Sequence, residues 1–146
     1  MKIDEAKIFL TEFRINSESS KNKKYTEKFL RLLNEIQIKI VDRARIDHLE
    51  SELELIIGNF KIAENNIQVK KELKKFIQFL QSEFNLTIPH YYTRIGMVFG
   101  LVATIFFGFL SLFIGVALGT SIGLIVDEKA KKEGRKLNTE LSEFLI

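Results

Sequence analysis

The chain has 146 residues, a formal net charge of +3, an isoelectric point of about 9.1 and no cysteine. This length suits one small domain with an appendage, and so mild a positive charge does not indicate nucleic acid binding. Without cysteine, the chain has no disulfide bonds, thiol nucleophiles or thiolate metal ligands.

Hydropathy divides the chain into two regimes. The first 90 residues are rich in Lys, Glu and Asn, whereas residues 95–126 contain no charged side chain and hold six of the eight glycines. The N-terminal segment MKIDEAKIFLTEF lacks a long apolar run and carries Asp4 and Glu5, so we do not expect a secretory signal. We expect residues 1–88 to be a cytoplasmic helical domain and residues 95–126 to be a membrane segment.

Apolar residues at helical spacing predict that the front domain is all-α. Residues 2–14 form the first predicted helix, a polar run over 15–25 reads as a loop, and Thr26 is the expected N-cap of the next helix. The predicted stripes are Ile3, Ala6, Leu10, Phe13; Phe29, Leu33, Ile36, Ile40; Ile46, Leu49, Leu53, Ile56, Phe60; and Val69, Leu73, Phe76, Leu80, Phe84.

The second and third stripes are out of phase by about one residue. Either one long helix with a rotating buried face or a kink near residues 42–47 fits this pattern. Gly58 and the polar residues 63–66 end that element, and Asn66 caps a last helix over 67–84. We therefore expect a helical hairpin or three-helix bundle, small enough that a partner or second copy would help stabilise it.

Residues 89–94 read as an interfacial linker. Pro89 and the residue before it disfavour helix, so the chain redirects there. Tyr91, Tyr92 and Arg94 directly precede the apolar run, as aromatic and basic residues do at a membrane interface. His90 fits an interfacial polar residue better than a metal ligand or pH sensor.

The 32 uncharged residues of 95–126 would form a helix of roughly 48 Å, against about 30 Å for a bilayer core. Their small residues recur every fourth position and the phase breaks once, which predicts two helices with a turn near residues 109–113. The alternative is one long tilted transmembrane helix. The two small-residue rows are Gly96, Gly100, Thr104, Gly108 and Ser111, Gly115, Gly119, Gly123.

Such rows let two helix backbones approach closely, which is how helices associate in lipid. They pack either on each other within one hairpin or outward, in a homo-oligomer. Basic residues precede and follow the apolar run, and basic flanks favour the cytoplasmic face. A hairpin would keep both flanks, and so both termini, in the cytoplasm.

The C-terminal third resembles small bacterial glycine-zipper membrane proteins. In these, a hairpin with glycine at every fourth residue precedes an Asp-x-Lys-Ala-x-x-Glu-Gly-Arg-x-Leu-like tail. Here GVALGTSIGLIVDEKAKKEGRKL, residues 115–137, carries the match, and the lead-in from residue 79 is similar. The resemblance implies a bacterial inner-membrane hairpin and no particular activity.

The tail, residues 127–146, is basic and then sets Leu137, Leu141 and Phe144 at helical spacing. We expect a short amphipathic helix lying on the inner surface or docking on the front domain. Its basic residues would serve as a positive-inside anchor or bind anionic lipid. They are Lys129, Lys131, Lys132, Arg135 and Lys136.

Motifs for catalysis are absent from the sequence: it has no phosphate-binding glycine loop, nucleophile elbow or HExxH. We expect no enzyme, cofactor or metal site, and no nucleic acid partner. Two functions remain open. One is a membrane-anchored interaction protein whose cytoplasmic helices bind a partner or self-associate; the other is a membrane-perturbing or pore-forming effector controlled by those helices.

Overall fold

The computed structural model describes residues 1–40, 42–63, 68–107 and 110–144. That part of the chain is all-α, as predicted, and it divides into two compact units, Met1–Asn85 (unit 1) and Leu86–Ile146 (unit 2). The expected front domain ended at residue 88, whereas unit 1 ends directly after its last helix.

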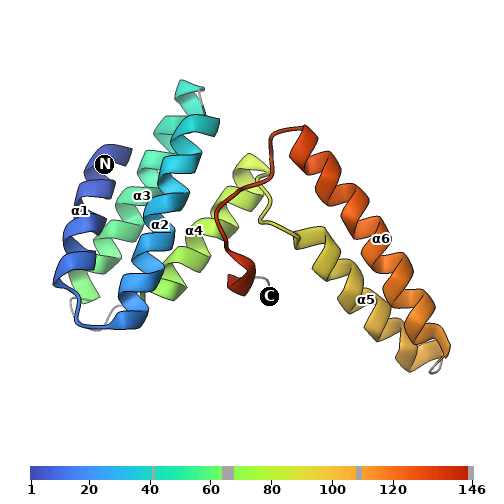
Figure 1. The fold of residues 1–146 in the computed structure, drawn as a ribbon. Helices are drawn as coiled ribbons and strands as arrows, with labels where there is room; N and C mark the ends of the chain where they lie inside the picture. Colours follow the sequence, from blue (N-terminus) through green and yellow to red (C-terminus); the bar gives the residue numbers. More distant parts are fainter. Residues whose placement is uncertain (41, 64–67, 108–109, 145–146) are drawn as a thin grey trace. The chain divides into compact units, whose positions relative to one another are not determined.

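Unit 1 is a helical bundle with more helices than the three-helix bundle expected. Each helix packs on the next in the ring order α1, α2, α4, α3 (Figure 1). Because α2 and α4 begin where α1 and α3 end, each end of the bundle gathers two helix N-termini and two C-termini. The helices are α1 (Ile3–Asn16), α2 (Ser20–Lys39), α3 (Arg43–Ala63) and α4 (Val69–Phe84).

The core of unit 1 contains the predicted apolar stripes together with Leu32, Ile57 and Ile77, which those stripes did not include. Of the stripe members, only Phe13 and Ile46 remain half-buried, and the others are buried. Aromatic rings join the helices: Phe29 on α2 meets Phe76 on α4 at 5.0 Å between ring centroids, and Phe13 on α1 meets Phe60 on α3 at 5.1 Å. The helical periodicity therefore predicted the buried faces correctly.

The start of α2 differs from the prediction. Ser19, not Thr26, is the N-cap, because its side-chain oxygen accepts a hydrogen bond from the Asn22 amide at 3.3 Å. Thr26 lies inside the helix, buried, and its hydroxyl donates to the Asn22 carbonyl. The run over 15–25 was predicted as a loop because it is polar, yet its second half is the exposed first turns of α2.

A break separates α2 from α3, so the single long helix is wrong. Ile40 has extended backbone angles, and Asp42 begins the next helix by accepting a hydrogen bond from the Ala44 amide at 3.2 Å. Gly58 lies within α3 rather than at its end, and a Cβ there would meet nothing within 4 Å. The expected cap Asn66 lies outside the described residues.

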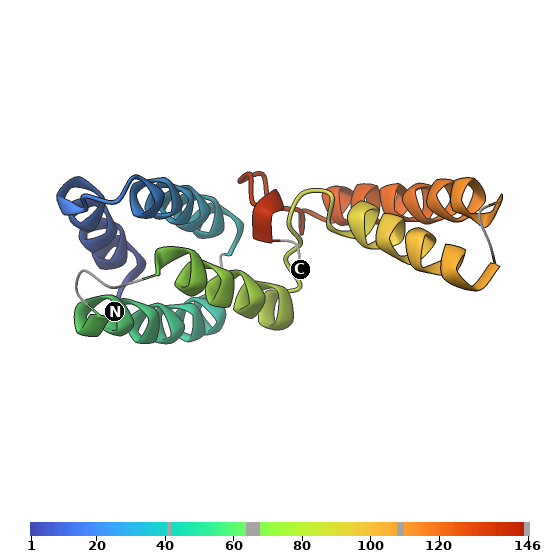
Figure 2. The same ribbon diagram turned by 90° about the horizontal axis from the view of Figure 1, so that it is seen from below.

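Unit 2 is an antiparallel pair of helices, α5 (Tyr91–Phe107) and α6 (Leu110–Lys132), shown side by side in Figure 2. The alternative of one long helix is therefore wrong. Its helices also extend beyond the predicted limits: α5 includes residues 91–94, predicted as linker, and α6 includes residues 127–132, predicted as tail.

The tail does not form the predicted amphipathic helix. Gly134, with φ of 71°, ends α6 in the left-handed conformation that favours glycine. The chain after Gly134 forms no helix up to a short 3₁₀ helix, η2 (Ser142–Phe144). Leu137, Leu141 and Phe144 are nevertheless buried, so their burial does not require the predicted helix.

Candidate functional site

The two helices of unit 2 meet through glycine backbones. A Cβ added to Gly100 would lie 2.5 Å from the carbonyl oxygen of Gly115, and one added to Gly96 or Gly119 would collide with the other residue's backbone. Gly123 approaches the backbone of Tyr92 and Thr93 in the same way. We call this contact the glycine seam. Because backbone atoms occupy the space of a side chain, Gly96, Gly100, Gly119 and Gly123 admit no larger residue unless the helices move apart.

The two helices run antiparallel, so the residue four positions later in α5 contacts the residue four positions earlier in α6. Gly96 faces Gly119 and Gly100 faces Gly115, so the two predicted rows lie against each other within one chain. Among the other row residues, Gly108 lies outside the described residues, and the side chains of Thr104 and Ser111 are not described.

Beside the seam runs a shallow apolar groove of about 420 Å³. The glycines form its floor, and its sides are Ile95 and Phe99 on α5 and Ile122 and Val126 on α6. The groove exists because residues without side chains leave a hollow between two ridges of large ones.

At the base of the hairpin, Asp127 of α6 caps α5. Its buried carboxylate accepts hydrogen bonds from the backbone amides of Tyr92 at 3.2 Å and Thr93 at 3.0 Å, and from the Thr93 hydroxyl. The first amides of a helix lack partners within it, and a negative charge at that end is favourable. Asp127 therefore supplies from a neighbouring helix what an N-cap residue normally supplies locally.

Sequence reasoning missed this role of Asp127, treating it as the first residue of the tail. The available signal was its position. The uncharged run ends at Asp127, one helical turn beyond Gly123, where the row register places it beside the start of α5.

A second closure joins the chain before α5 to the chain after α6. The Thr87 amide donates to the Arg135 carbonyl at 2.9 Å, and the Leu137 amide donates to the Thr87 carbonyl at 2.8 Å. Thr87 is buried, and its hydroxyl oxygen has no hydrogen-bond partner among the described residues. The bridge and the Asp127 cap together hold both ends of the hairpin at one base.

The residues predicted to lie at a membrane interface gather at this base. Tyr91 and Tyr92 begin α5, with their rings 5.1 Å apart, and Arg94 follows, exposed. Lys129, Lys131 and Lys132 are exposed in the last turns of α6.

Arg135 and Lys136 follow α6 and are half-buried. Arg135 pairs with Glu133, and this hydrogen bond is the main cause that raises the pKa of the guanidinium above its usual value. Tyr92 contributes in the same direction, so Arg135 lies within reach of the first turn of α5.

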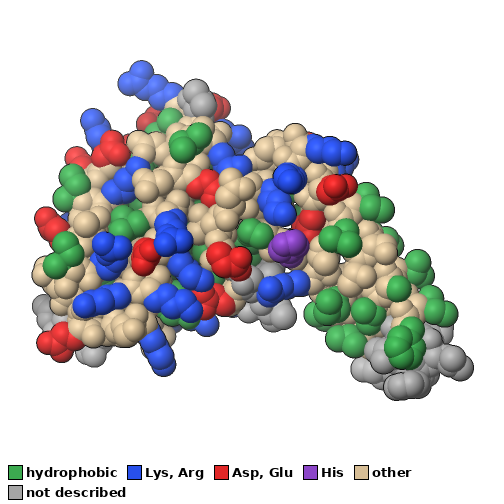
Figure 3. Space-filling model, in the orientation of Figure 1, with side chains coloured by type: hydrophobic (Ala, Val, Ile, Leu, Met, Phe, Trp, Pro, Cys, Tyr) green, Lys and Arg blue, Asp and Glu red, His purple; other side chains and the backbone are tan. Residues whose placement is uncertain are grey.

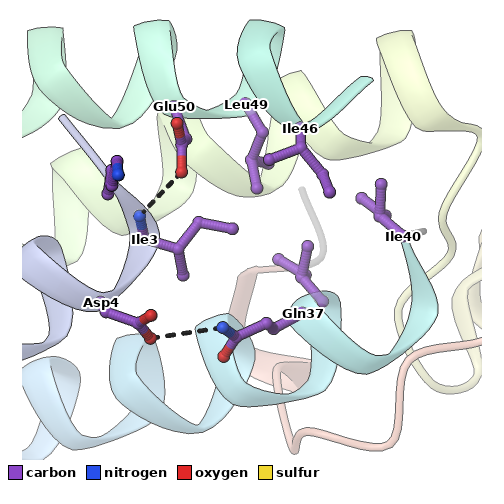
Figure 4. Close-up of a pocket in the computed structure, with 9 residues that line it drawn as sticks. Ile3, Asp4, Gln37, Ile40, Ile46, Leu49 and Glu50 are labelled. Atoms are coloured by element: carbon purple, nitrogen blue, oxygen red, sulfur yellow. Dashed lines mark hydrogen bonds between the residues drawn. The ribbon is translucent and has the colours of Figure 1, made fainter. Parts of the chain in front are cut away.

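Unit 1 contains a smaller cavity of about 150 Å³ where α1 and α3 begin and α2 ends (Figure 4). The Ile3 amide donates to Glu50 at 3.2 Å, and the Gln37 amide nitrogen donates to Asp4 at 3.3 Å. Its polar groups thus bind one another across the cavity walls, and the remaining lining is mostly apolar. We assign no ligand to it.

No protein-family model, curated protein or solved structure matches this chain. Within the described residues, no helix combines the length and the hydropathy of a candidate membrane span. The same residues contain no group of three or more His, Cys, Asp or Glu placed to hold a metal ion.

Proposed function

We propose that this protein is a membrane anchor in which unit 2 inserts as a helical hairpin and holds unit 1 at the cytoplasmic face of a bacterial inner membrane, where unit 1 binds a protein partner. The observation that carries the proposal is the apolar exterior of α5 and α6. The exposed large side chains are Met97, Val98, Phe99, Leu101, Val102, Phe113, Ile114, Leu118, Ile122, Leu124 and Ile125.

Such an exterior is unusual for a protein surface in water. Large contiguous apolar patches on soluble proteins mark contact with a membrane or another protein. Figure 3 shows hydrophobic side chains over α5 and α6 away from the base, whereas charged side chains cover unit 1 and the base of the hairpin. Lipid would cover the exposed apolar side chains on all sides of the hairpin, whereas a single protein partner would cover only some of them.

Length limits how the hairpin would insert. After Arg94, the uncharged part of α5 is residues 95–107, 13 residues or about 20 Å, and that of α6 is residues 110–126, 17 residues or about 25 Å. Seventeen residues is the lower end of the range for a spanning helix. We therefore propose a short span that thins the bilayer locally, with Tyr91 and Tyr92 at the interface.

Orientation follows from the base. The cap and the bridge hold the start of α5 and the end of α6 together, so a spanning hairpin would place both on one side of the membrane. The exposed Arg94, Lys129, Lys131 and Lys132 favour the cytoplasmic side.

The anchor accounts for the hairpin better than the pore-forming effector does. A pore needs polar groups facing its lumen, but the hydroxyls of Thr120 and Ser121 hydrogen-bond to carbonyls of their own helix, Val116 and Ala117, at 2.7 Å each. The glycine seam is occupied within one chain as well, which leaves less of it to drive a ring of subunits.

The test compares two exposed apolar residues, Leu118 in the middle of the uncharged part of α6 and Ile38 in unit 1, which are 60% and 81% exposed. A lysine in the middle of a spanning helix costs about 2.5–3.5 kcal/mol. Leu118→Lys should therefore reduce the fraction of chain that floats with phosphatidylcholine vesicles, whereas Ile38→Lys should float like the wild-type chain.

Topology is tested on the same chain, because the absence of native cysteine makes single-cysteine labelling clean. Ser51→Cys in unit 1 and Asn138→Cys after α6 should both resist an impermeant maleimide in intact spheroplasts and react after lysis. Flotation that neither lysine alters, or labelling of Asn138→Cys but not Ser51→Cys from outside, would contradict the hairpin anchor.

A further inference from the structure

One end of unit 1 concentrates lysines. It is formed by the N-terminal ends of α2 and α4 and the C-terminal ends of α1 and α3 (Figure 1). Residues 18–28 contain four lysines and residues 68–75 contain another four, against three glutamates. We define the basic end by its exposed or half-exposed residues Ile15, Lys21, Lys23, Lys24, Tyr25, Ile62, Lys70 and Lys71.

The three glutamates of these segments leave an excess of five positive charges among the eight lysines. Glu72 is buried and binds Lys75 at 2.8 Å and the Asn59 side chain at 2.9 Å. Glu27 pairs with Arg31, one turn further along α2. In sequence, Glu18 precedes Lys21 and Glu64 follows Ile62, and Figure 3 shows many Lys and Arg side chains, with some Asp and Glu between them, over the lower part of unit 1.

Aromatic and apolar groups accompany the lysines. The Tyr25 ring has the ammonium groups of Lys24 and Lys70 each 5.7 Å from its centroid, so it links the lysines of α2 with those of α4. Ile15 and Ile62, in the last turns of α1 and α3, are 68% and 85% exposed. The basic end therefore combines positively charged lysines with a tyrosine ring and two exposed isoleucine side chains.

The opposite end of unit 1 lacks this combination. There both signs are mixed, with Asp42, Asp47 and Glu50 beside Arg43 and Arg45, although Ile38 is as exposed as the isoleucines of the basic end. The bundle is therefore polarised, and Ile38 provides a matched control.

We propose that the basic end of unit 1 binds the surface of an anionic phospholipid bilayer, with its lysines among the headgroups and Ile15 and Ile62 reaching the interfacial region. Each lysine near an anionic surface strengthens binding about fivefold. A nucleic acid would use the lysines but would leave both isoleucines in water, whereas a bilayer interface accommodates charge and apolar tips together. Anchoring by unit 2 would raise the local concentration of lipid, but lipid binding by the basic end does not depend on it.

The experiment uses the full chain with Ile62→Cys carrying an environment-sensitive fluorophore, beside Ile38→Cys. Each is mixed with phosphatidylcholine vesicles or with vesicles containing 30% phosphatidylglycerol. We expect a blue shift at position 62 with the anionic vesicles only, reversed by 0.5 M salt, and none at position 38. Changing Lys21, Lys23, Lys70 and Lys71 together to Gln should abolish the shift, with circular dichroism confirming the helices.

An equal shift at both positions, a shift that ignores lipid charge, or a larger response to a 20-nucleotide RNA or DNA than to anionic vesicles would overturn the proposal. Failure of the hairpin anchor is recognised separately, as a chain that does not float with pure phosphatidylcholine vesicles. A charge-dependent shift in that case would support the basic end while removing the anchor.

Discussion

The bundle of unit 1 and the helix pair of unit 2 differ in whether their large apolar side chains are buried or exposed. Unit 1 buries most of them: Phe29, Leu33, Phe76 and their neighbours fill the bundle, although isolated residues such as Ile38 and Ile62 stay exposed among charged ones. The helix pair of unit 2 turns them outward, and its two helices meet through glycine backbone.

The difference reflects two ways of joining helices. In water, burying apolar area provides the driving force. In lipid this force is largely absent between helices, and close backbone contact is what remains. Unit 2 is built in the second way, which is the physical reason for proposing it as the membrane-embedded unit.

The largest effect is expected from a bulky residue in the glycine seam, which should destabilise unit 2 and not unit 1. Gly119→Leu places four side-chain carbons where the Gly96 backbone lies, so we expect the seam to open, at a cost above the usual overpacking range of about 1–3 kcal/mol. Proteolysis in micelles should cut unit 2 and leave unit 1 protected. Leu118→Ala, on the exposed neighbour, is the control and should leave the resistance of unit 2 unchanged.

Truncating a core side chain of unit 1 should destabilise unit 1 and leave unit 2 unchanged. Phe29 is fully buried against Phe76, so Phe29→Ala should lower the unfolding free energy of unit 1 by about 3–5 kcal/mol. Denaturant unfolding followed by circular dichroism measures this loss. Equal destabilisation of unit 2 would show that the two units do not fold independently.

Removing the cap of α5 tests the base of the hairpin. Asp127→Ala leaves the amides of Tyr92 and Thr93 without their acceptor and should cost about 1–3 kcal/mol. Asp127→Asn should cost less, because asparagine also caps helices well. Hydrogen exchange at the first turn of α5 reports the effect, and the exposed neighbour variant Glu128→Ala should leave it unchanged.

The smallest expected effect is that of Gly58→Ala in unit 1, which we compare with Gly96→Ala in unit 2. Gly58 lies in the interior of α3 with open space around it, so Gly58→Ala should stabilise unit 1 by roughly 0.5–1 kcal/mol through helix propensity. Gly96→Ala should destabilise unit 2, because the added methyl meets the Gly119 backbone. Thermal unfolding of the two variants should shift in opposite directions.

Periodicity alone determined much of this protein. The stripes from Ile3 to Phe84 predicted the buried faces of unit 1, because a helix repeats its environment every three to four residues whatever it packs against. The same helical spacing, applied to Gly96, Gly100, Gly115 and Gly119, predicted two rows of small residues on two helices.

Tertiary structure decided the features that depend on residues distant in sequence. Asp127 caps amides more than thirty positions earlier, Thr87 pairs with the chain around Lys136, and Leu137 and Leu141 are buried without forming a helix. Local propensity carries no information about such partners, because the free energy of these contacts arises only once the hairpin has closed. The glycine rows were readable from the sequence, but that they face each other was decided by the register of the folded pair.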